Sequence, residues 1–509
     1  MGCVIYMETH PCAPPPAKSG TGKRGIKIMH KTLLINPPFN IAKENYDSSI
    51  SVGLLSIATY LDSKGVSVEM IDGARQKNYL DLIRQKAIGC DCAGLSVMTT
   101  QVDNAIKISR LIKEINPACK IVWGGAHPAF FIEQTAAHPL LDIVCYGEGE
   151  ITFYEIASGK NLSDINGIAY KKGGQIIVNP PRSLHDPASM PLFNWDLAPK
   201  EILEKLYLIP SLTSRGCPHR CTFCINAILK NRWRPRTAEQ VLADLKTIKS
   251  KEYFQGKKLR FWDENFFVDI NRAKKIINGM LERNLTMPWE TTIRCNYLRA
   301  GMVDDDFMEK LKQSGCYLLS FGAESGCPRI LSKIKKDISP DDVINSAKMS
   351  LRHGIIPQYS FMIGLPGETK SDMMETLRLI DKLVSLSDKI QILGPQAFRP
   401  YPGSPLYEEC VQSGWQAPQT TEEWAHLVKN ELSYLTVQNF PWVKDKNFVE
   451  SMEAYVRFGA HSIKSAMGSS IKAQKLLKLG FVLLCQLRWK LKFFFWPIEF
   501  KLAKKFVTK

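Results

Sequence analysis

The sequence predicts an α/β protein: a doubly wound parallel sheet, then a partial (β/α)6 barrel, then a helical and basic C-terminal region. Three observations predict this order. Short apolar segments alternate with amphipathic segments over residues 31–150, and the alternation resumes with a longer period from residue 206. The chain of 509 residues also has a formal net charge of +17, and ten Lys or Arg against one Glu in residues 471–509 supply over half of it.

The N-terminal domain is expected over residues 29–150 as a Rossmann-like sheet. Its predicted strands are 31–38, 66–72, 92–98, 120–126 and 142–150, and its clearest helices are 52–65 and 101–117. The ligand crevice of such a sheet lies beyond the carboxyl ends of the strands, where the segments NPPFN, MTTQ and GGAHP fall.

Two flanking segments are expected to lack a domain core of their own. Residues 1–28 are predicted to be a disordered leader, because Pro, Gly and Lys dominate their second half and no secretory signal pattern is present. Residues 151–205 are predicted to be a connector, with a small hairpin that turns at Gly173 and Gly174.

The second α/β domain is expected over residues 206–410. Its predicted strands are 207–214, 258–264, 289–295, 317–325, 356–364 and 389–398, and its helices are about 237–250, 270–284, 304–314, 340–353 and 371–386. Six strand–helix units without a reversal predict a partial TIM-type barrel, whose chemistry lies on the loops after the strands.

The C-terminal region, residues 411–509, is predicted to be helical with a basic amphipathic tail. The tail segment 476–506 mixes apolar residues with Lys and Arg, and its longest uncharged stretch, 479–487, is far shorter than the roughly 20 residues that a spanning helix needs. Trp489 and Trp496 lie among its cations, a composition suited to the headgroup–acyl boundary of a membrane. The alternative is a helix packed against the barrel with solvated lysines. We therefore expect a cytoplasmic protein, with a peripheral site on the inner face of the membrane if the tail binds lipid.

Three of the fourteen cysteines are closely spaced, and most of the others are predicted to be small buried side chains. Cys217, Cys221 and Cys224 form a C-x3-C-x2-C pattern in the loop after the first barrel strand. A closed zinc site needs four ligands, whereas three thiolates suit a four-iron cluster with one iron left open. A three-thiolate zinc site is the alternative.

The cysteine segment and four further motifs follow one another in the same order as in the radical S-adenosylmethionine (SAM) superfamily. The sequence resembles in particular the members that have an N-terminal cobalamin-binding domain. The cysteine segment is CPHRCTFC, and the other motifs are FWDENFF (261–267), FGAESG (321–326), MIGLPGE (362–368) and RPYPGSPLYE (399–408). The resemblance covers roughly residues 31–410. It implies three cofactors: a [4Fe–4S] cluster on the three cysteines, SAM and cobalamin.

The resemblance also implies which residues bind SAM. Asp263 and Glu264 are expected near the methionine ammonium group, and Arg294 near the methionine carboxylate. Glu324 and Ser325 are expected to contact the ribose. The loop that holds Gly364, Gly367 and Glu368 is expected to let the backbone approach the adenosine closely. The alternatives are that GLPGE is an ordinary turn and that Arg294 pairs with an acid on the barrel rim.

For cobalamin, the sequence lacks the D-x-H-x-x-G motif whose histidine ligates cobalt in one well-known type of domain. His127 follows the fourth strand, which is the wrong place for that ligand. We therefore expect cobalamin to bind without a protein histidine, at loops that include Thr99, Thr100, Gly124 and Gly125. The alternative is a sheet that serves only as a scaffold.

The expected activity is anaerobic methylation of an unactivated carbon, on a hydrophobic or lipid-like small molecule, with one SAM methylating cobalamin and another yielding the radical. Oxidative cyclisation or rearrangement within the same family is the runner-up. A methylthiotransferase fits less well, because no second set of three clustered cysteines is present. An iron–sulfur electron carrier or sensor is the alternative from another class. Flavodoxin or ferredoxin is the expected electron donor, and no nucleic-acid partner is expected.

Overall fold

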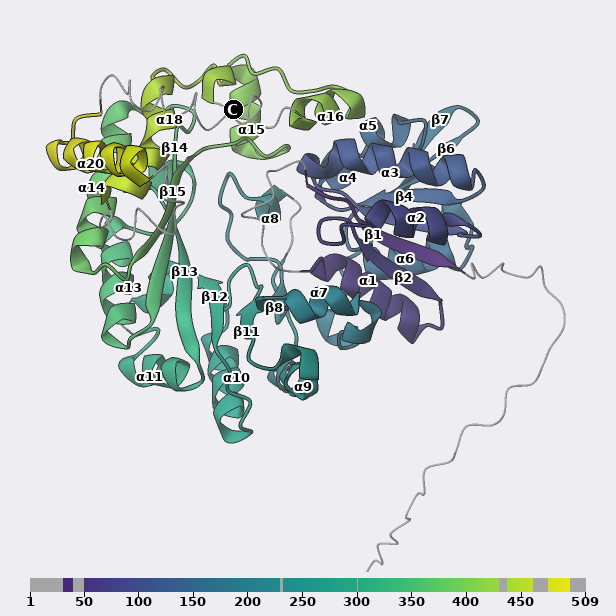
Figure 1. Ribbon diagram of the computed structural model, residues 1–509, viewed down its shortest axis with the longest axis horizontal. Helices are drawn as coiled ribbons and strands as arrows, with labels where there is room; N and C mark the ends of the chain where they lie inside the picture. The colour runs from purple at the N-terminus through teal and green to yellow at the C-terminus, as the bar shows by residue number, and fades with distance from the viewer. Residues whose placement is uncertain are drawn as a thin grey trace, which may run out of the picture.

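The computed structural model describes residues 31–39, 50–228, 232–299, 301–429, 437–460 and 475–494. The predicted leader and part of the tail lie outside these residues. Figure 1 shows two α/β bodies side by side, with the helices that follow the second body passing across to the first.

The first body is a seven-stranded sheet with the strand order β2-β1-β3-β4-β5-β6-β7. Its strands are β1 (Thr32–Asn36), β2 (Val68–Asp72), β3 (Cys92–Ser96), β4 (Lys120–Gly124), β5 (Ile143–Cys145), β6 (Ile168–Lys172) and β7 (Gln175–Val178). The first five are parallel, and β6 and β7, which form the hairpin predicted in the connector, join antiparallel. Every residue of β1 is buried, as in a parallel strand covered on both faces.

The helices of the first body include the two that the sequence predicted and four that it did not indicate. They are α1 (Val52–Ser63), α2 (Tyr79–Ala87), α3 (Val102–Ile115), α4 (Ala126–Phe130), α5 (Ile132–Ala137) and α6 (Gly149–Ala157), and α7 (Lys200–Lys205) leads into the second body. Helices α1 and α3 are the predicted ones, and α2, α4, α5 and α6 are the additions. In α2 only Ile83 and Ala87 are fully buried, so its apolar stripe is too narrow to identify from sequence.

The second body is a six-stranded, all-parallel sheet with the order β15-β14-β13-β12-β11-β8, as predicted. Its strands are β8 (Leu208–Ser211), β11 (Lys258–Phe261), β12 (Trp289–Ile293), β13 (Cys316–Glu324), β14 (Ile356–Ile363) and β15 (Gln391–Ala397). Along β14, Tyr359 and Phe361 are buried, whereas Gln358 and Ser360 are half-buried. This alternation leaves one face dry and the other face polar and accessible.

The barrel helices are α9 (Ala238–Ser250), α10 (Ile270–Glu282), α11 (Asp305–Gln313), α12 (Pro328–Lys333), α13 (Pro340–Arg352) and α14 (Lys370–Leu386). All of them except α12 begin at a residue whose side chain caps the helix. Thr237, Ser339 and Thr369 each form a capping box with the residue three positions later, which satisfies backbone N–H groups at the helix start.

The C-terminal helices tie the two bodies together. They are α15 (Pro405–Gln412), α16 (Thr421–Lys429), α18 (Lys446–Tyr455) and α20 (Lys475–Leu491). Trp424 of α16 is buried against the first body, with ring centroids 5.0 Å from Phe131 and 5.8 Å from His127. Within the described ranges, no helix combines the length and the apolar character needed to cross a membrane.

Candidate functional site: two adjoining cavities

The three cysteines border one cavity at the carboxyl end of the barrel strands. This cavity, about 340 Å³, is lined by Cys217, Cys221 and Cys224, and none of the three forms a disulfide. No group of three or more His, Cys, Asp or Glu in the described part of the chain is placed to hold a single metal ion. The three thiols share one cavity. They fit a cluster in which each cysteine takes a different iron.

A short two-stranded ribbon closes the base of the cysteine loop. Strand β9 (Ser214–Arg215) pairs antiparallel with β10 (Arg234–Pro235), and helix α8 (Ile225–Ile228) lies in the loop between them. In Figure 1, α8 lies between the two bodies. The ribbon therefore fixes the loop at the junction of the two sheets.

Arg294, which follows β12, is a buried cation in the cysteine cavity. Its Nη1 donates to Cys221 Sγ at 3.4 Å, and only 6% of the residue is exposed. Its Nε and Nη2 have no hydrogen-bond partner in the described residues, so the rim acid of the alternative interpretation is not found among them. Unpaired N–H groups of a buried guanidinium favour an anionic ligand such as a carboxylate.

Sequence reasoning missed Lys336, which lines the same cavity. Its Nζ donates to Glu324 Oε1 at 2.8 Å, and both residues are buried. Burial alone would lower the pKa of Lys336, but the Glu324 carboxylate beside it raises that pKa overall. In the sequence Lys336 follows another lysine and resembles a surface charge, so no local signal identifies it.

Of the residues expected to contact SAM, Glu264, Arg294 and Glu324 line the cavity. Asp263 instead accepts hydrogen bonds from the Thr213 backbone N–H at 2.7 Å and from the hydroxyls of Thr213 and Ser214 at 2.5 Å. Its carboxylate holds β11 to the loop after β8.

The other expected SAM residues do not line the cavity either. Ser325 is fully buried, with its hydroxyl 3.1 Å from that of Thr376. The loop of Gly364 and Gly367 is closed internally, because Glu368 accepts the backbone N–H of Gly364 at 2.5 Å. Both glycines have positive φ, so the turn itself requires them.

A second cavity, about 300 Å³, opens at the carboxyl edge of the first sheet. Its lining is rich in glycine and apolar side chains, including Gly53, Gly94, Gly124, Gly125, Gly147, Gly149, Leu34, Leu54, Ile57, Val122 and Phe153. A Cβ on Gly94 would lie 2.4 Å from the Phe153 ring, so the narrow space depends on glycine. A slot of this chemistry fits the flat base of a corrinoid's nucleotide tail.

No histidine lines the second cavity in the described residues. His127 is fully buried, 3.3 Å from the Thr99 hydroxyl, and burial lowers its pKa to about 3. Of the residues expected at cobalamin, Gly124 and Gly125 line the cavity, whereas Thr99 and Thr100 do not.

The two cavities meet at Glu264 and at the residues just before the cysteine loop. Glu264 lines both cavities, and Ser214, Arg215 and Gly216 line the second one. Burial raises the pKa of Glu264.

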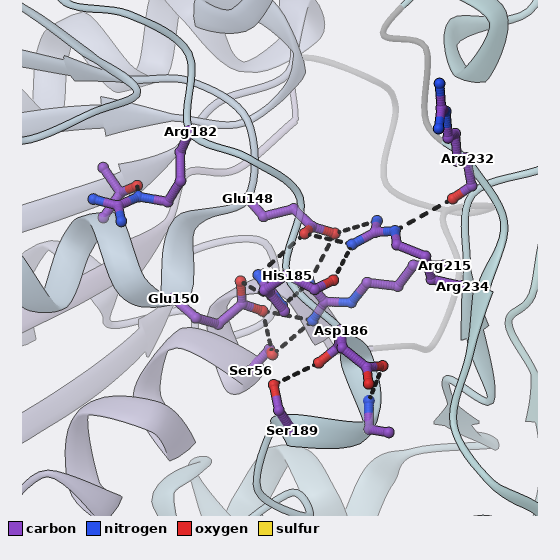
Figure 2. A network of polar contacts seen from close by, with 12 residues as sticks. Ser56, Glu148, Glu150, Arg182, His185, Asp186, Ser189, Arg215, Arg232 and Arg234 are labelled. Carbon is purple, nitrogen blue, oxygen red and sulfur yellow. Dashed lines mark hydrogen bonds and ion pairs between the residues drawn. The ribbon is translucent and has the colours of Figure 1, made fainter.

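A buried ionic network, which we call the Glu–Arg clamp (Ser56, Glu148, Glu150, His185, Arg215 and Arg234), joins the two bodies at this junction. Figure 2 shows Arg215 and Arg234 of the β9–β10 ribbon directed at the two glutamates that begin α6. Glu148 accepts from Arg234 at 2.8 and 2.9 Å, and Glu150 accepts from Arg215 at 2.5 Å. Burial would raise the pKa of Glu150, but Arg215 lowers it to about 2, so the pair stays ionised.

Comparison with known proteins matches each body to a known domain. A family model of the Radical SAM superfamily matches residues 211–380, and one of the B12 binding domain matches residues 44–157.

Relatives extend over most of the chain. An uncharacterised methyltransferase of Pyrococcus horikoshii is 29% identical over 85% of this chain and 93% of its own length. A cytidylyl-2-hydroxyethylphosphonate methyltransferase of Streptomyces wedmorensis is 25% identical over 78% and 85%. An anaerobic magnesium-protoporphyrin IX monomethyl ester cyclase of Rubrivivax gelatinosus is 23% identical over 64% and 60%.

Two solved structures share the fold. The radical SAM methyltransferase TsrM of Kitasatospora setae matches with a TM-score of 0.61 and 19% identity, over 76% of this chain and 78% of that one. The cobalamin-dependent radical enzyme OxsB matches with a TM-score of 0.61 and 20% identity, over 79% and 56%.

The cofactors of the two domains are a [4Fe–4S] cluster, SAM and cobalamin, and each domain has a cavity whose lining fits its cofactor. A role as a simple iron–sulfur carrier is therefore set aside. The chain therefore joins an N-terminal B12-binding domain to a radical SAM domain, the two domains of a cobalamin-dependent radical SAM enzyme.

Proposed function

We propose that the protein is a cobalamin-dependent methyltransferase that acts on an unactivated carbon. The observation that carries this proposal is the junction of the two cavities at Glu264. A methyl group held in one cavity and a substrate radical formed in the other would meet there without leaving the protein. The relatives from Pyrococcus and Streptomyces, both named methyltransferases, support it.

The proposed roles follow from the lining of the cavities. Cys217, Cys221 and Cys224 hold the cluster, and Arg294 offers two unpaired N–H groups to the methionine carboxylate. When bound, these cofactors supply reductive cleavage of SAM to a 5′-deoxyadenosyl radical and a methyl group carried on cobalamin. The reaction needs a reductant, for which we propose flavodoxin or ferredoxin. The Glu–Arg clamp, whose glutamates and arginines line the second cavity, holds the two bodies together at the junction.

The barrel interior limits what part of a substrate reacts. Arg260 and Glu290 form an ion pair at 3.3 Å, and the Ser320 hydroxyl donates to Gln358 at 2.9 Å. Arg260, Ser320 and Gln358 all line the cysteine cavity. Polar groups of this kind favour a polar reacting end. We therefore propose that a hydrophobic or lipid-like substrate would have a polar head, which enters the barrel and reacts. Its apolar part would stay outside the barrel.

A second candidate is oxidative cyclisation, which the cyclase relative from Rubrivivax supports. The two reactions differ in how they use SAM. Methylation consumes two molecules and releases both 5′-deoxyadenosine and S-adenosylhomocysteine, whereas cyclisation releases 5′-deoxyadenosine alone.

The test is to quantify both products from anaerobically reconstituted protein, given reductant, SAM and a metabolite extract of the source cell. Methylation predicts 5′-deoxyadenosine and S-adenosylhomocysteine in equal amounts, with both absent in Cys221→Ala. Cys410→Ala, a buried cysteine outside the cavity, is the matched control and should retain both products. Release of 5′-deoxyadenosine alone would favour the cyclase reaction, and release of neither would reject both.

A further inference from the structure

Helix α20 is apolar on two opposite faces. One face is buried against the barrel, where Val482 and Cys485 are fully buried and Trp489 is 5% exposed. The opposite face is exposed and carries a row of leucines: Leu479 (36% exposed), Leu483 (47%), Leu484 (37%), Leu487 (53%) and Leu491 (65%). We call these five residues the leucine row. A surface helix normally presents polar residues on that side.

The buried face fixes which way the leucine row points. Trp489 Nε1 donates to Asp381 of α14 at 2.8 Å, and Lys492 pairs with the same carboxylate at 2.9 Å. Phe494 is buried, with its ring centroid 5.7 Å from that of Tyr455 in α18. Figure 1 shows α20 on the outer side of the barrel, beside α14 and α18. The packed helix predicted from the sequence is therefore present, and its leucines remain uncovered.

The leucine row forms a continuous apolar strip. Leu479, Leu483, Leu487 and Leu491 are spaced four residues apart, which aligns them along about 18 Å of helix. The exposed Lys490 is the one charged residue within this arc. An exposed apolar strip of this length on a protein surface marks an interaction site.

We propose that the leucine row docks on the surface of an anionic phospholipid bilayer. The charge of the tail favours an anionic partner, because residues 471–509 hold ten Lys or Arg and one Glu. Two copies of such a tail would repel one another, whereas the negative charge of an anionic leaflet attracts its cations. Helix α20 has 17 residues and basic residues within it, so it lies in the interface and does not span it. This inference is independent of the methylation.

The test is cosedimentation of the full chain with vesicles of equal parts phosphatidylcholine and phosphatidylglycerol. The double variant Leu483→Gln, Leu487→Gln removes apolar contact and leaves every charge in place. It is expected to lower the partition coefficient at least about tenfold. Burying one leucine side chain in an apolar environment stabilises binding by enough to change a partition coefficient by about that factor. The control is Leu80→Gln on α2, a leucine of 36% exposure outside the row, which should bind as the parent does.

Three results would overturn the proposal. The first is no binding of the parent protein to these vesicles. The second is equal binding of the double variant and the Leu80→Gln control. The third is parent protein that does not bind vesicles but forms a dimer in sedimentation velocity, while the double variant stays monomeric. That result would show that the leucine row binds a second copy of the chain. Unchanged circular dichroism and cluster content in the variants exclude misfolding as the cause of lost binding.

Discussion

Glu368 is a carboxylate whose protonation is coupled to the loop after β14. One of its oxygens accepts the backbone N–H groups of Gly364 and Leu365, and the other has no partner in the described residues. Burial raises the pKa of Glu368 to about 7, and the two backbone donors offset part of that rise. The closed form of this loop is therefore more stable when Glu368 is protonated.

A pH dependence of stability follows from that pKa. The folded protein binds this proton more tightly than the unfolded chain, whose Glu pKa is near 4.5. The stabilisation is fully present below that value and is lost as the pH rises toward 7. Urea unfolding near pH 5 and near pH 8 should show that the parent loses on the order of 1–3 kcal/mol more than Glu368→Gln. The exposed Glu408→Gln is the control, and an equal pH dependence in all three proteins would refute the assignment.

Residue roles were predictable only where the signal is local. The three cysteines lie within eight positions, and their spacing alone predicts a shared cavity. Asp263 and Glu264 are neighbours in one acidic motif, but one packs against Thr213 and the other lines the cavity. Lys336 meets Glu324 only through the tertiary fold. Which way a side chain points is set by packing that no motif records.

At the scale of elements, the Glu–Arg clamp connects the start of α6 to the base of the cysteine loop. Glu148 contacts both arginines of the β9–β10 ribbon and also lines the second cavity. His185 of the connector lies 3.1 Å from Glu148, and burial lowers the pKa of this imidazole. The clamp thereby links the position of the cluster to the shape of the cobalamin cavity.

Breaking the clamp should weaken both stability and cobalamin retention. Glu148→Gln keeps the side-chain shape but removes the carboxylate that pairs with the half-buried Arg234, whereas Arg215 keeps Glu150, so the change costs on the order of 1–3 kcal/mol. The readouts are the urea midpoint and the dissociation constant for hydroxocobalamin by equilibrium dialysis.

The matched control for the clamp is Glu239→Gln, which removes an exposed pair with Arg283. That change should leave the urea midpoint and the hydroxocobalamin affinity unchanged. If the two variants behave alike, the clamp has no role in joining the bodies.

Elements with a clear apolar period were predicted well, and short pairings were not. All six barrel strands lie where the alternation placed them, because each must bury one face under a helix. Strands β9 and β10 have two residues each, too few to show any period. They form because Arg215 and Arg234 meet the glutamates of another domain.

For the whole molecule, the arrangement of the bodies places the two cofactor cavities side by side. The β9–β10 ribbon, at the base of the cysteine loop, connects the two bodies. Helix α16 also contacts the first body, because its Trp424 packs against Phe131. The two cavities therefore adjoin, with Glu264 in the lining of both. Sequence predicted both domains but not their contact, because contacts between domains depend on residues far apart in the chain.

The most direct test of this account is the mass of the product made with SAM whose methyl group carries deuterium. A substrate that gains one fully deuterated methyl group in the parent protein, and none in Cys221→Ala, is the predicted result. A product that has lost hydrogen or formed a ring without gaining the labelled methyl group would contradict methylation as the function of this enzyme.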